Sequence, residues 1–553
     1  MAQPTQTKPR LLIIGAGHRG NSYARATVES GLGVVAAVVE PIAFKRRSLG
    51  KKYVWLDQQP TPEQEFDDWK DFVAYEHQRR KDEAAGLPVP PGVDGVFVCV
   101  IDELHIHVVK ALAPFGMHIM CEKPLATNLN DCVEMQHTLQ LYPQRVFAIG
   151  HVLRYSPHNL LLRHLLLEKR VIGDVLSIEH VEPVGWWHFS HSFVRGHWRN
   201  SKTSAPALLT KSCHDIDFLL WMLCQPPPNS PVTAKPHVPS TISSAGSVKQ
   251  FRRSQKPKEA GAATNCMSCP IKETCMYSAK RIYHDRFLAK GQTAWPVEIV
   301  NPQIGHILQT QGPSQAREAL YASLAEDYDT TTTPVADIES RPWFGRCVYE
   351  ADNDVCDDQT VTISWDDIPT SPQENITPQP TGHGAKTAIF HMIAQTRAQC
   401  QRRGWIYGTT GEIYYDSHNI TVHDFTTEIN DDETPNTNTN STTPPSKPWA
   451  AAKISTRIYE PEVPQNSHHG GGDDGLTQQF LKAIIAVDGK KMGVQEAQVE
   501  FLGCTIEDCI RSHAAVFAAE EAREGKKVVE WDEWWAKNVR PILEAGEATG
   551  TSS

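Results

Sequence analysis

Three glycines near the N-terminus have the spacing of a loop that binds a phosphate-bridged cofactor. Gly15, Gly17 and Gly20 follow a short apolar strand as G-x-G-x-x-G and open a helical pattern, and the next apolar strand, GVVAAVVE, ends at Glu40. In the dinucleotide-binding unit, the first glycine permits a tight turn, the second lets the backbone approach the pyrophosphate, and the third lets helix and strand pack. Strand, glycines, helix, strand and acid all occur in order here, which favours this unit over a chance glycine turn.

The residues around this loop predict which dinucleotide it takes. The pyrophosphate rests on the helix N-terminus, so we expect His18 and Arg19 to lie beside it. Glu40 can accept hydrogen bonds from a ribose hydroxyl and would repel a 2′-phosphate, which favours NAD. Arg46 and Arg47 lie nearby and keep NADP open as an alternative.

The segment CEKPLATN at 121–128 places two opposite charges and a helix breaker directly after the apolar run GMHIM. In a doubly wound sheet, ligands bind outside the carboxyl ends of the strands. We therefore expect Pro124 to end strand pairing, Lys123 to project into the crevice beside the nicotinamide, and Glu122 to offset its charge. The alternative is a simple ion pair at the end of a strand.

A second group of ionisable residues lies in the helical pattern APALLTKSCHDIDFLLWML. Lys211, His214 and Asp215 fall on one turn, and Asp217 lies a turn beyond. A stripe of apolar positions runs along the same predicted helix: Leu209, Cys213, Ile216, Leu220 and Leu223. A lone histidine there would be read as a capped core residue, but a histidine beside a lysine and two aspartates indicates a site.

Aromatic and basic residues are concentrated between 186 and 199. Trp187 and Trp198 offer faces for a sugar ring, and His188 and Arg195 offer donors for a carboxylate or phosphate on it. The alternative is a loop core with snorkelling arginines.

One cysteine cluster with metal-like spacing reads CMSCPIKETC, C-x2-C-x5-C. It supplies Cys266, Cys269 and Cys275, but a structural zinc site needs a fourth ligand, for which the candidates are His284, Cys347 and Cys213. The two interpretations are a zinc site and a loop of reduced thiols. We favour the loop of reduced thiols, without metal.

The elements that must position these residues change in type near residue 150. Before it, apolar strands alternate with helical patterns, which is typical of a parallel doubly wound sheet. We expect residues 1–150 to form this NAD(P)-binding domain, with 51–92 as a charged surface insertion. We expect 151–540 to form a second, α/β domain.

Several segments of the second domain read as antiparallel strands: GDVLSIEHVEPVGWW, RCVYEADNDVC, QTVTISWDD, TAIFHMIAQT and GWIYGTTGEIYYDSHNITVHDF. Residues 428–449 are low in complexity and are expected to be a disordered excursion. Two segments read as amphipathic helices: TQQFLKAIIAV and residues 496–525. In HHGGGDDG, before the first of them, we expect Asp473 or Asp474 to cap the helix. The alternative is a flexible loop that faces a ligand.

Composition limits the classes of partner. The 553 residues carry a net charge of -11, with 40% hydrophobic and 22% charged residues. These values are ordinary for a globular protein and argue against bulk nucleic-acid binding, which needs a basic face. No apolar run is long enough to span a membrane. Thirteen cysteines without a secretory context indicate reduced thiols in a cytoplasmic protein.

Taken in order, the glycine motif, the acidic strand end, ELHIH, CEKPLA, HVLRYSP and HDID resemble the Gfo/Idh/MocA oxidoreductases. KSCHDIDFLLW and HHGGGDDGL are similar to one branch of that family. The resemblance implies NAD(P)-dependent chemistry on sugars, polyols and related small molecules. It also implies a Rossmann domain followed by an α/β domain, whose open, mostly antiparallel sheet commonly forms an oligomer interface; we therefore expect a homo-oligomer.

The resemblance also assigns roles to individual residues. Lys123 matches the lysine that touches nicotinamide and substrate, His105 matches a histidine beside the cofactor, and His214 matches the acid/base histidine. Family members place an aspartate four residues before that histidine, where this chain has Thr210 followed by Lys211. Further residues expected at the substrate are Arg154 and Tyr155 of HVLRYSP, and Asp217 of HDID.

Three functions follow from this reading. The first is an NAD(P)-dependent dehydrogenase of a sugar, sugar acid or related carbohydrate. The second is an NAD-dependent glycoside hydrolase that works by oxidation, elimination, water addition and reduction. The third is a regulator that senses the cofactor without catalysis, and the presence of both Lys123 and His214 argues against it.

Overall fold

The computed structural model describes residues 8–142, 144–224, 235–367, 384–428, 454–464 and 467–544. Its N-terminal part is a six-stranded parallel sheet in the order β3-β2-β1-β4-β5-β6. The strands are β1 (Arg10–Ile14), β2 (Val34–Val39), β3 (Glu65–Phe66), β4 (Gly95–Val98), β5 (His118–Cys121) and β6 (Phe147–Ile149). The strand order reverses between β1 and β4, and the crevice at that switch point is where ligands bind in such sheets.

Helices connect these strands, as the alternation of patterns predicts. They are α1 (His18–Ser30), α2 (Ala43–Tyr53), α3 (Trp69–Ala84), α4 (His105–Leu112) and α5 (Leu129–Gln140). The predicted surface insertion at 51–92 is wrong, because this segment supplies the edge strand β3 and the long helix α3. A capping box of Asp68 and Asp71 fixes the start of α3, and Phe72 buries its apolar side.

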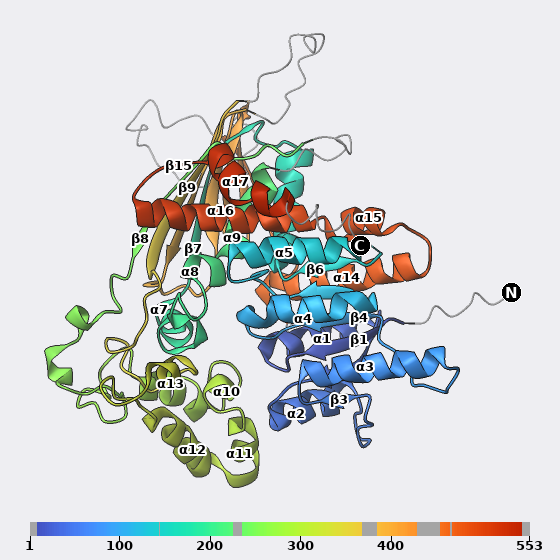
Figure 1. The fold of residues 1–553 in the computed structure, drawn as a ribbon. Helices are drawn as coiled ribbons and strands as arrows, with labels where there is room; N and C mark the ends of the chain where they lie inside the picture. The colour runs from blue at the N-terminus through green and yellow to red at the C-terminus, as the bar shows by residue number, and fades with distance from the viewer. Residues whose placement is uncertain are drawn as a thin grey trace, which may run out of the picture.

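The second part is a nine-stranded sheet in the order β14-β13-β12-β11-β7-β10-β9-β8-β15 (Figure 1). Its pairs are antiparallel, except for the parallel pair of β7 and β10. The strands are β7 (Val175–Pro183), β8 (Thr241–Ser247), β9 (Asp358–Trp365), β10 (Lys386–Ile393), β11 (Arg403–Gly408), β12 (Gly411–Tyr415), β13 (Ile420–Glu428), β14 (Ile454–Tyr459) and β15 (Val529–Glu530). This confirms the predicted two-part α/β fold. The segment RCVYEADNDVC, however, forms turns rather than a strand, and residues 429–449 of the predicted excursion lie outside the described residues.

Helices cover one face of this sheet. The helices α8 (Ala207–Thr210), α9 (Cys213–Leu223), α16 (Ile506–Gly525) and α17 (Trp531–Asn538) belong to this part, and α16 runs across β8 and packs against α9 (Figure 1). Burial alternates strictly along β9, as expected when only one face meets the core. The predicted single helix around His214 is broken into α8 and α9 at Lys211 and Ser212.

A helical lobe extends from the second part. Its helices are α10 (Val297–Val300), α11 (Ile304–Gln311), α12 (Pro313–Ala325) and α13 (Val335–Glu339), which lie together away from the large sheet (Figure 1). The lobe has an apolar core of its own, which includes Trp187, Ile304 and Leu320.

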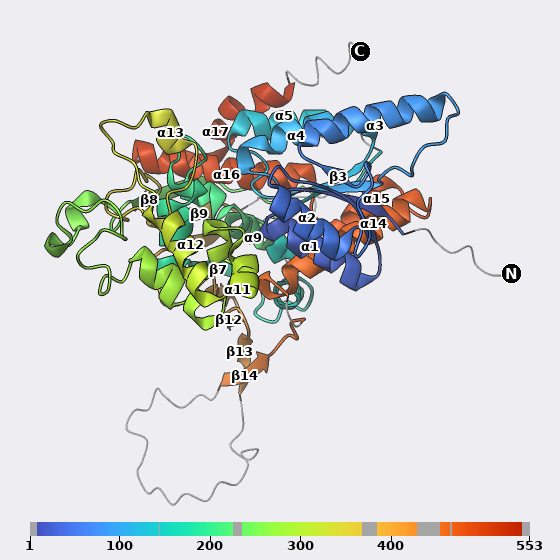
Figure 2. The ribbon, with the colours of Figure 1, turned by 90° about the horizontal axis from the view of Figure 1, so that it is seen from below.

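Helix α14 (Gly472–Asp488) belongs to the nucleotide-binding part although it comes late in the sequence. It lies beside α1 in both views (Figures 1 and 2). Phe480 packs its ring 5.5 Å from that of Phe97 on β4, and Leu481 and Ile484 are fully buried. The linear division into 1–150 and 151–540 therefore leaves out a helix that completes the first core.

Candidate active site

The glycine loop between β1 and α1 leaves one backbone position open. A Cβ atom on Gly15 would lie 2.3 Å from the carbonyl oxygen of Cys99, and one on Gly20 would lie 1.9 Å from that of Gly15. These two glycines are therefore required by packing, and the φ of +100° at Gly15 also favours glycine. A Cβ on Gly17 would meet nothing within 4 Å. The space over Gly17 suits the approach of a pyrophosphate.

Glu40 holds this loop in place at the end of β2. Its carboxylate accepts hydrogen bonds from the backbone N–H groups of Ala16, at 2.9 Å, and Ile42, at 3.1 Å. Arg46 does not face an open site, because it pairs with Glu65 at 2.8 Å and with a second carboxylate, that of Asp67.

The loop at 468–474 lies against the glycine loop, which the sequence reading did not foresee. His468 packs its ring 4.8 Å from that of His18, and Asp473 pairs with Arg19 at 2.6 Å. The expectation that Asp473 or Asp474 caps α14 is wrong, because the N-cap residue is Gly471 and no side chain caps the helix.

Glu122, at the end of β5, forms an ion pair with Arg19. Its carboxylate lies 2.7 Å from Arg19 Nε and accepts a short hydrogen bond from Tyr23. Burial raises the pKa of Glu122, but Arg19 and Tyr23 lower it more, so the pKa lies below its usual value. Arg19 thereby joins the end of β5 to α1 and to α14.

Lys123 reaches from the end of β5 to the second part of the chain. Its Nζ donates a hydrogen bond of 2.6 Å to the carbonyl oxygen of Thr210, one turn before His214, and lies 5.9 Å from the ring of Trp198. Trp198 in turn donates to Asp102 at 2.8 Å. Lys123 therefore lies between the two parts of the chain.

His105 is fully buried beneath this turn. Its Nδ1 lies 2.7 Å from the carbonyl oxygen of Pro124, and its Nε2 lies 3.3 Å from that of Val100. These two contacts make His105 a support of the turn that carries Lys123.

His214, at the start of α9, is held by an arginine from β11's N-terminal flank. Arg402 Nη2 donates a hydrogen bond of 2.8 Å to His214 Nε2, and its Nε pairs with Asp215. Because arginine has no acceptor, His214 Nε2 must be the unprotonated nitrogen and Nδ1 must carry the proton. Burial, together with Arg402 and the nearby lysines, lowers the pKa of His214 well below its usual value. The imidazole is therefore neutral at physiological pH.

Lys211 belongs to the same charged network. Its Nζ lies 3.0 Å from Glu182 on β7, and the other oxygen of Glu182 lies 3.1 Å from Arg402 Nε. Lys211 Nζ also lies 3.1 Å from Cys400 Sγ, which is 3.4 Å from His188 Nδ1. The structure thus brings Lys123, Lys211, His214 and His188 toward one region.

Other predicted substrate residues have internal partners. Arg154 and Asp217 form a buried bidentate pair at 2.7 and 2.8 Å, and the hydroxyl of Tyr155 donates to the carbonyl oxygen of Leu502. Arg195 is fully buried and donates to backbone carbonyls, and Trp187 lies in the core of the helical lobe. These contacts account for the burial of all five side chains without a ligand.

The residues that sequence reasoning missed are Arg402, Glu182, Cys400 and the His468 loop. Arg402 is 188 positions away from His214, and it lies among other arginines in QRRGW with no motif to distinguish it. The loop at 468–474 did carry a sign, because its run of glycines beside two histidines is typical of a ligand-facing turn.

The three cysteines considered as zinc ligands, Cys266, Cys269 and Cys275, do not form a group of neighbouring ligand atoms in the described part of the chain. In the described part of the chain, groups of three or more potential ligand atoms within 4.8 Å of one another occur only elsewhere. Cys266 Sγ instead accepts a hydrogen bond of 3.3 Å from Arg195.

Comparison with known proteins agrees with this geometry. Residues 10–150 match the profile of the Gfo/Idh/MocA oxidoreductase family with an NAD-binding Rossmann fold. The rhizopine catabolism protein MocA of Rhizobium meliloti is 25% identical over 244 residues, which are 44% of this chain and 64% of that protein. An inositol 2-dehydrogenase of Saccharopolyspora erythraea is 30% identical over 155 residues, 28% of this chain and 41% of that one.

Among solved structures, levoglucosan dehydrogenase in complex with NADH and levoglucosan aligns with a TM-score of 0.55 at 14% identity, over 95% of this chain and 99% of that one. A putative NADPH-dependent oxidoreductase of Desulfitobacterium hafniense aligns with a TM-score of 0.53 at 15% identity, over 95% and 99% of the two chains. These likenesses show a shared fold. The chain spans less than two thirds of the length of the curated relatives that it matches. Because residues 10–150 match the family profile, this part of the chain is an NAD-binding Rossmann domain of the Gfo/Idh/MocA oxidoreductase type.

Proposed function

We propose that this protein is an NAD-dependent oxidoreductase that oxidises a CH–OH group of a sugar, sugar acid or related carbohydrate. The observation that carries the proposal is the hydrogen bond from Lys123 to Thr210, because it joins the strand end beside the expected nicotinamide to the turn that presents His214. The inositol and levoglucosan dehydrogenases among the relatives support the substrate class.

The choice of NAD follows from the residues that would face the adenosine ribose. Gly17 leaves room for the pyrophosphate, and Glu40 places a carboxylate at the end of β2. Arg46, which could have bound a 2′-phosphate, is already paired with two acids. When bound, the nicotinamide supplies a hydride acceptor.

The chain's own groups would handle the proton of the substrate hydroxyl. Hydride leaves a carbinol carbon only as that proton departs, so an acceptor must lie within hydrogen-bond reach. His214 is neutral and offers Nε2, provided that Arg402 yields this nitrogen to the substrate. Lys123 is a cation that can stabilise the developing alkoxide. Thr210 stands where family members have an aspartate, and the next residue, Lys211, adds a positive charge that is paired with Glu182.

A panel of polyols, anhydrosugars, sugars, uronates and aryl glycosides tests the proposal, with both NADH absorbance at 340 nm and aglycone release followed. We expect NADH to form in proportion to oxidised product. Lys123→Met and His214→Asn should each lower turnover by roughly a hundredfold or more. Lys110→Met is the matched control, since Lys110 is exposed and pairs only with Glu134. Full turnover by Lys123→Met would contradict the assignment, and aglycone release without net NADH would replace it with glycoside hydrolysis.

A further inference from the structure

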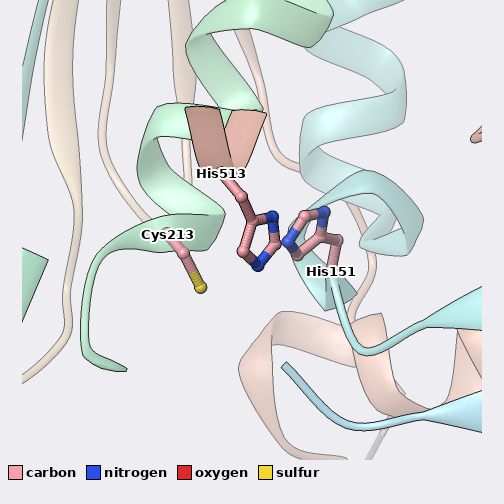
Figure 3. A group of neighbouring side chains, drawn as sticks. All are labelled: His151, Cys213 and His513. Carbon is pink, nitrogen blue, oxygen red and sulfur yellow. The ribbon is translucent and has the colours of Figure 1, made fainter. Parts of the chain in front are cut away.

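A second constellation of chemically reactive side chains is buried where β6, α9 and α16 meet. His151 follows β6, Cys213 begins α9, and Cys509 and His513 lie on α16 (Figure 3). Two groups in the described part of the chain have ligand atoms within 4.8 Å of one another: His151 with Cys213 and His513, and His151 with Cys504 and Cys509. The proposed reaction uses none of these side chains.

His513 is not available as a ligand, because the backbone occupies both of its ring nitrogens. Leu125 N–H donates to Nε2 at 2.8 Å, so Nδ1 must carry the proton that it donates to the carbonyl oxygen of Cys509, also at 2.8 Å. Its ring stacks on that of His151 at 5.5 Å between centroids (Figure 3). His513 therefore acts as a wall of the constellation and as a support for the turn that carries Lys123.

His151 is arranged as metal-binding histidines are. Its Nδ1 lies 3.1 Å from Asp217 Oδ1, and both ring nitrogens are fully buried without a regular hydrogen bond to any described residue. The polar groups beside the ring are the thiols of Cys213 and Cys504. A carboxylate behind one nitrogen fixes the ring and leaves the other nitrogen for a metal.

Two thiols face this imidazole at a suitable spacing. Cys504 Sγ and Cys509 Sγ lie 3.6 Å apart, close to the ~3.8 Å edge of a tetrahedron with zinc–sulfur distances near 2.3 Å. Both thiols are buried, at 5% and 1% exposure, and they would lose their protons as the metal binds.

The fixed charges beside the cluster are those of Asp217 and Arg154. Asp217 lies 3.1 Å from His151 Nδ1 and forms a bidentate pair with Arg154 at 2.7 and 2.8 Å. A divalent ion that binds the imidazole and the thiols displaces their protons, which keeps the added buried charge small.

We propose that His151, Cys504 and Cys509 form a buried structural site for a thiophilic divalent ion such as zinc. Cys213 Sγ lies within 4.8 Å of His151 but not of both other thiols, so it would complete a four-ligand set by moving toward them as the ion binds. All four residues are buried, at 0%, 5%, 1% and 0% exposure, so no position is open to substrate. The ion would tie α9, which carries His214, to the first turn of α16 and to the end of β6.

Metal analysis of the full-length protein, purified without chelators and with thiol reductant, tests the site. We expect about one equivalent of zinc per chain, and less than a tenth of that in Cys504→Ser and in Cys509→Ser. Cys224→Ser, which removes another buried thiol at the end of α9, should keep its zinc. Cobalt-substituted wild type should show thiolate-to-cobalt charge transfer, and chelation should lower its melting temperature.

Other results would overturn the proposal. One is a wild type that holds no zinc and takes up none in equilibrium dialysis. Another is zinc that survives in Cys504→Ser but is lost in Cys269→Ser, because the metal would then belong to the 266–275 segment. If the serine variants fail to fold, a wild-type cobalt spectrum without thiolate charge transfer decides against the site. None of these measurements depends on the oxidoreductase activity.

Discussion

The guanidinium of Arg402 decides which nitrogen of His214 is free to take a proton. It also pairs with two buried carboxylates, those of Asp215 and Glu182, so its removal weakens the charge balance of the network as well as leaving His214 unheld. A positioning role and a merely structural role for Arg402 can be separated by the pH dependence of turnover.

We expect Arg402→Met to move the acid limb of the kcat/KM profile to higher pH. Burial is the largest cause of the low pKa of His214, and the positive charge of Arg402 lowers this pKa further. Loss of Arg402 should therefore raise it. Activity that requires neutral His214 rises with pH through this pKa, and the limb should shift upward by roughly one pH unit or more. Arg403→Met, at the exposed neighbouring position, serves as the control. An unmoved limb in Arg402→Met would assign the proton acceptor to another group.

At the scale of elements, one buried carboxylate fastens α14 to α1. Asp473 is fully buried between Arg19 and His469, at 2.6 and 2.8 Å. Asp473→Ala leaves Arg19 short of a partner, and we expect a loss of about 3 kcal/mol in the free energy of unfolding. Glu29→Ala, which breaks an exposed pair with Arg25, should cost less than about 1 kcal/mol. Urea titrations of the two variants measure the difference.

The same pair gives stability a pH dependence. Burial alone would raise the pKa of Asp473, but Arg19 and His469 hold this pKa well below its usual value in the folded state. A carboxyl group with a depressed folded pKa stabilises the protein above its unfolded pKa of about 3.9 and loses this contribution as pH falls. The wild type should therefore lose more stability than Asp473→Ala between pH 5 and the onset of acid unfolding. Parallel losses in the two proteins would contradict the assignment.

Elements with local signals could be predicted from the sequence. The glycine loop, the strand ending at Lys123 and the strands β9 to β13 follow from periodicity and turn residues over a few positions. The segment at 51–92 misled because α3 is strongly charged, with an apolar side too narrow to detect. The break between α8 and α9 and the partners of Asp473 depend on residues far away in the chain, and pattern reading carries no information on them.

At the scale of the whole molecule, the nine-stranded sheet has one face without helices. In the described strands, that face presents half-buried aromatic side chains: Trp405 and Tyr407 stack at 6.3 Å, and Trp405 lies 5.1 Å from Tyr414. Ile389, on β10, is 37% exposed. An apolar face of this kind is typical of a protein–protein interface.

We expect the protein to form a homo-oligomer through this face. Light scattering at micromolar concentration should give a mass at least twice that of one chain for the wild type, and Trp405→Glu should shift it toward the monomer, because a buried unpaired charge opposes association. Val499→Glu alters a residue that is 62% exposed elsewhere and should change nothing. A monomeric wild type would refute the expectation.

Among the described helices, none combines the length and the apolar character that a membrane span requires.

The position of α14 also sets an order of events during synthesis. The strands of the nucleotide-binding sheet leave the ribosome first, but Leu11 and Ile13 on β1 share a core with Leu476 and Phe480. These partners emerge only after the large sheet and the helical lobe. The first part of the protein to be made is therefore among the last to be finished, and it must keep an apolar surface from aggregating while most of the chain is still being translated.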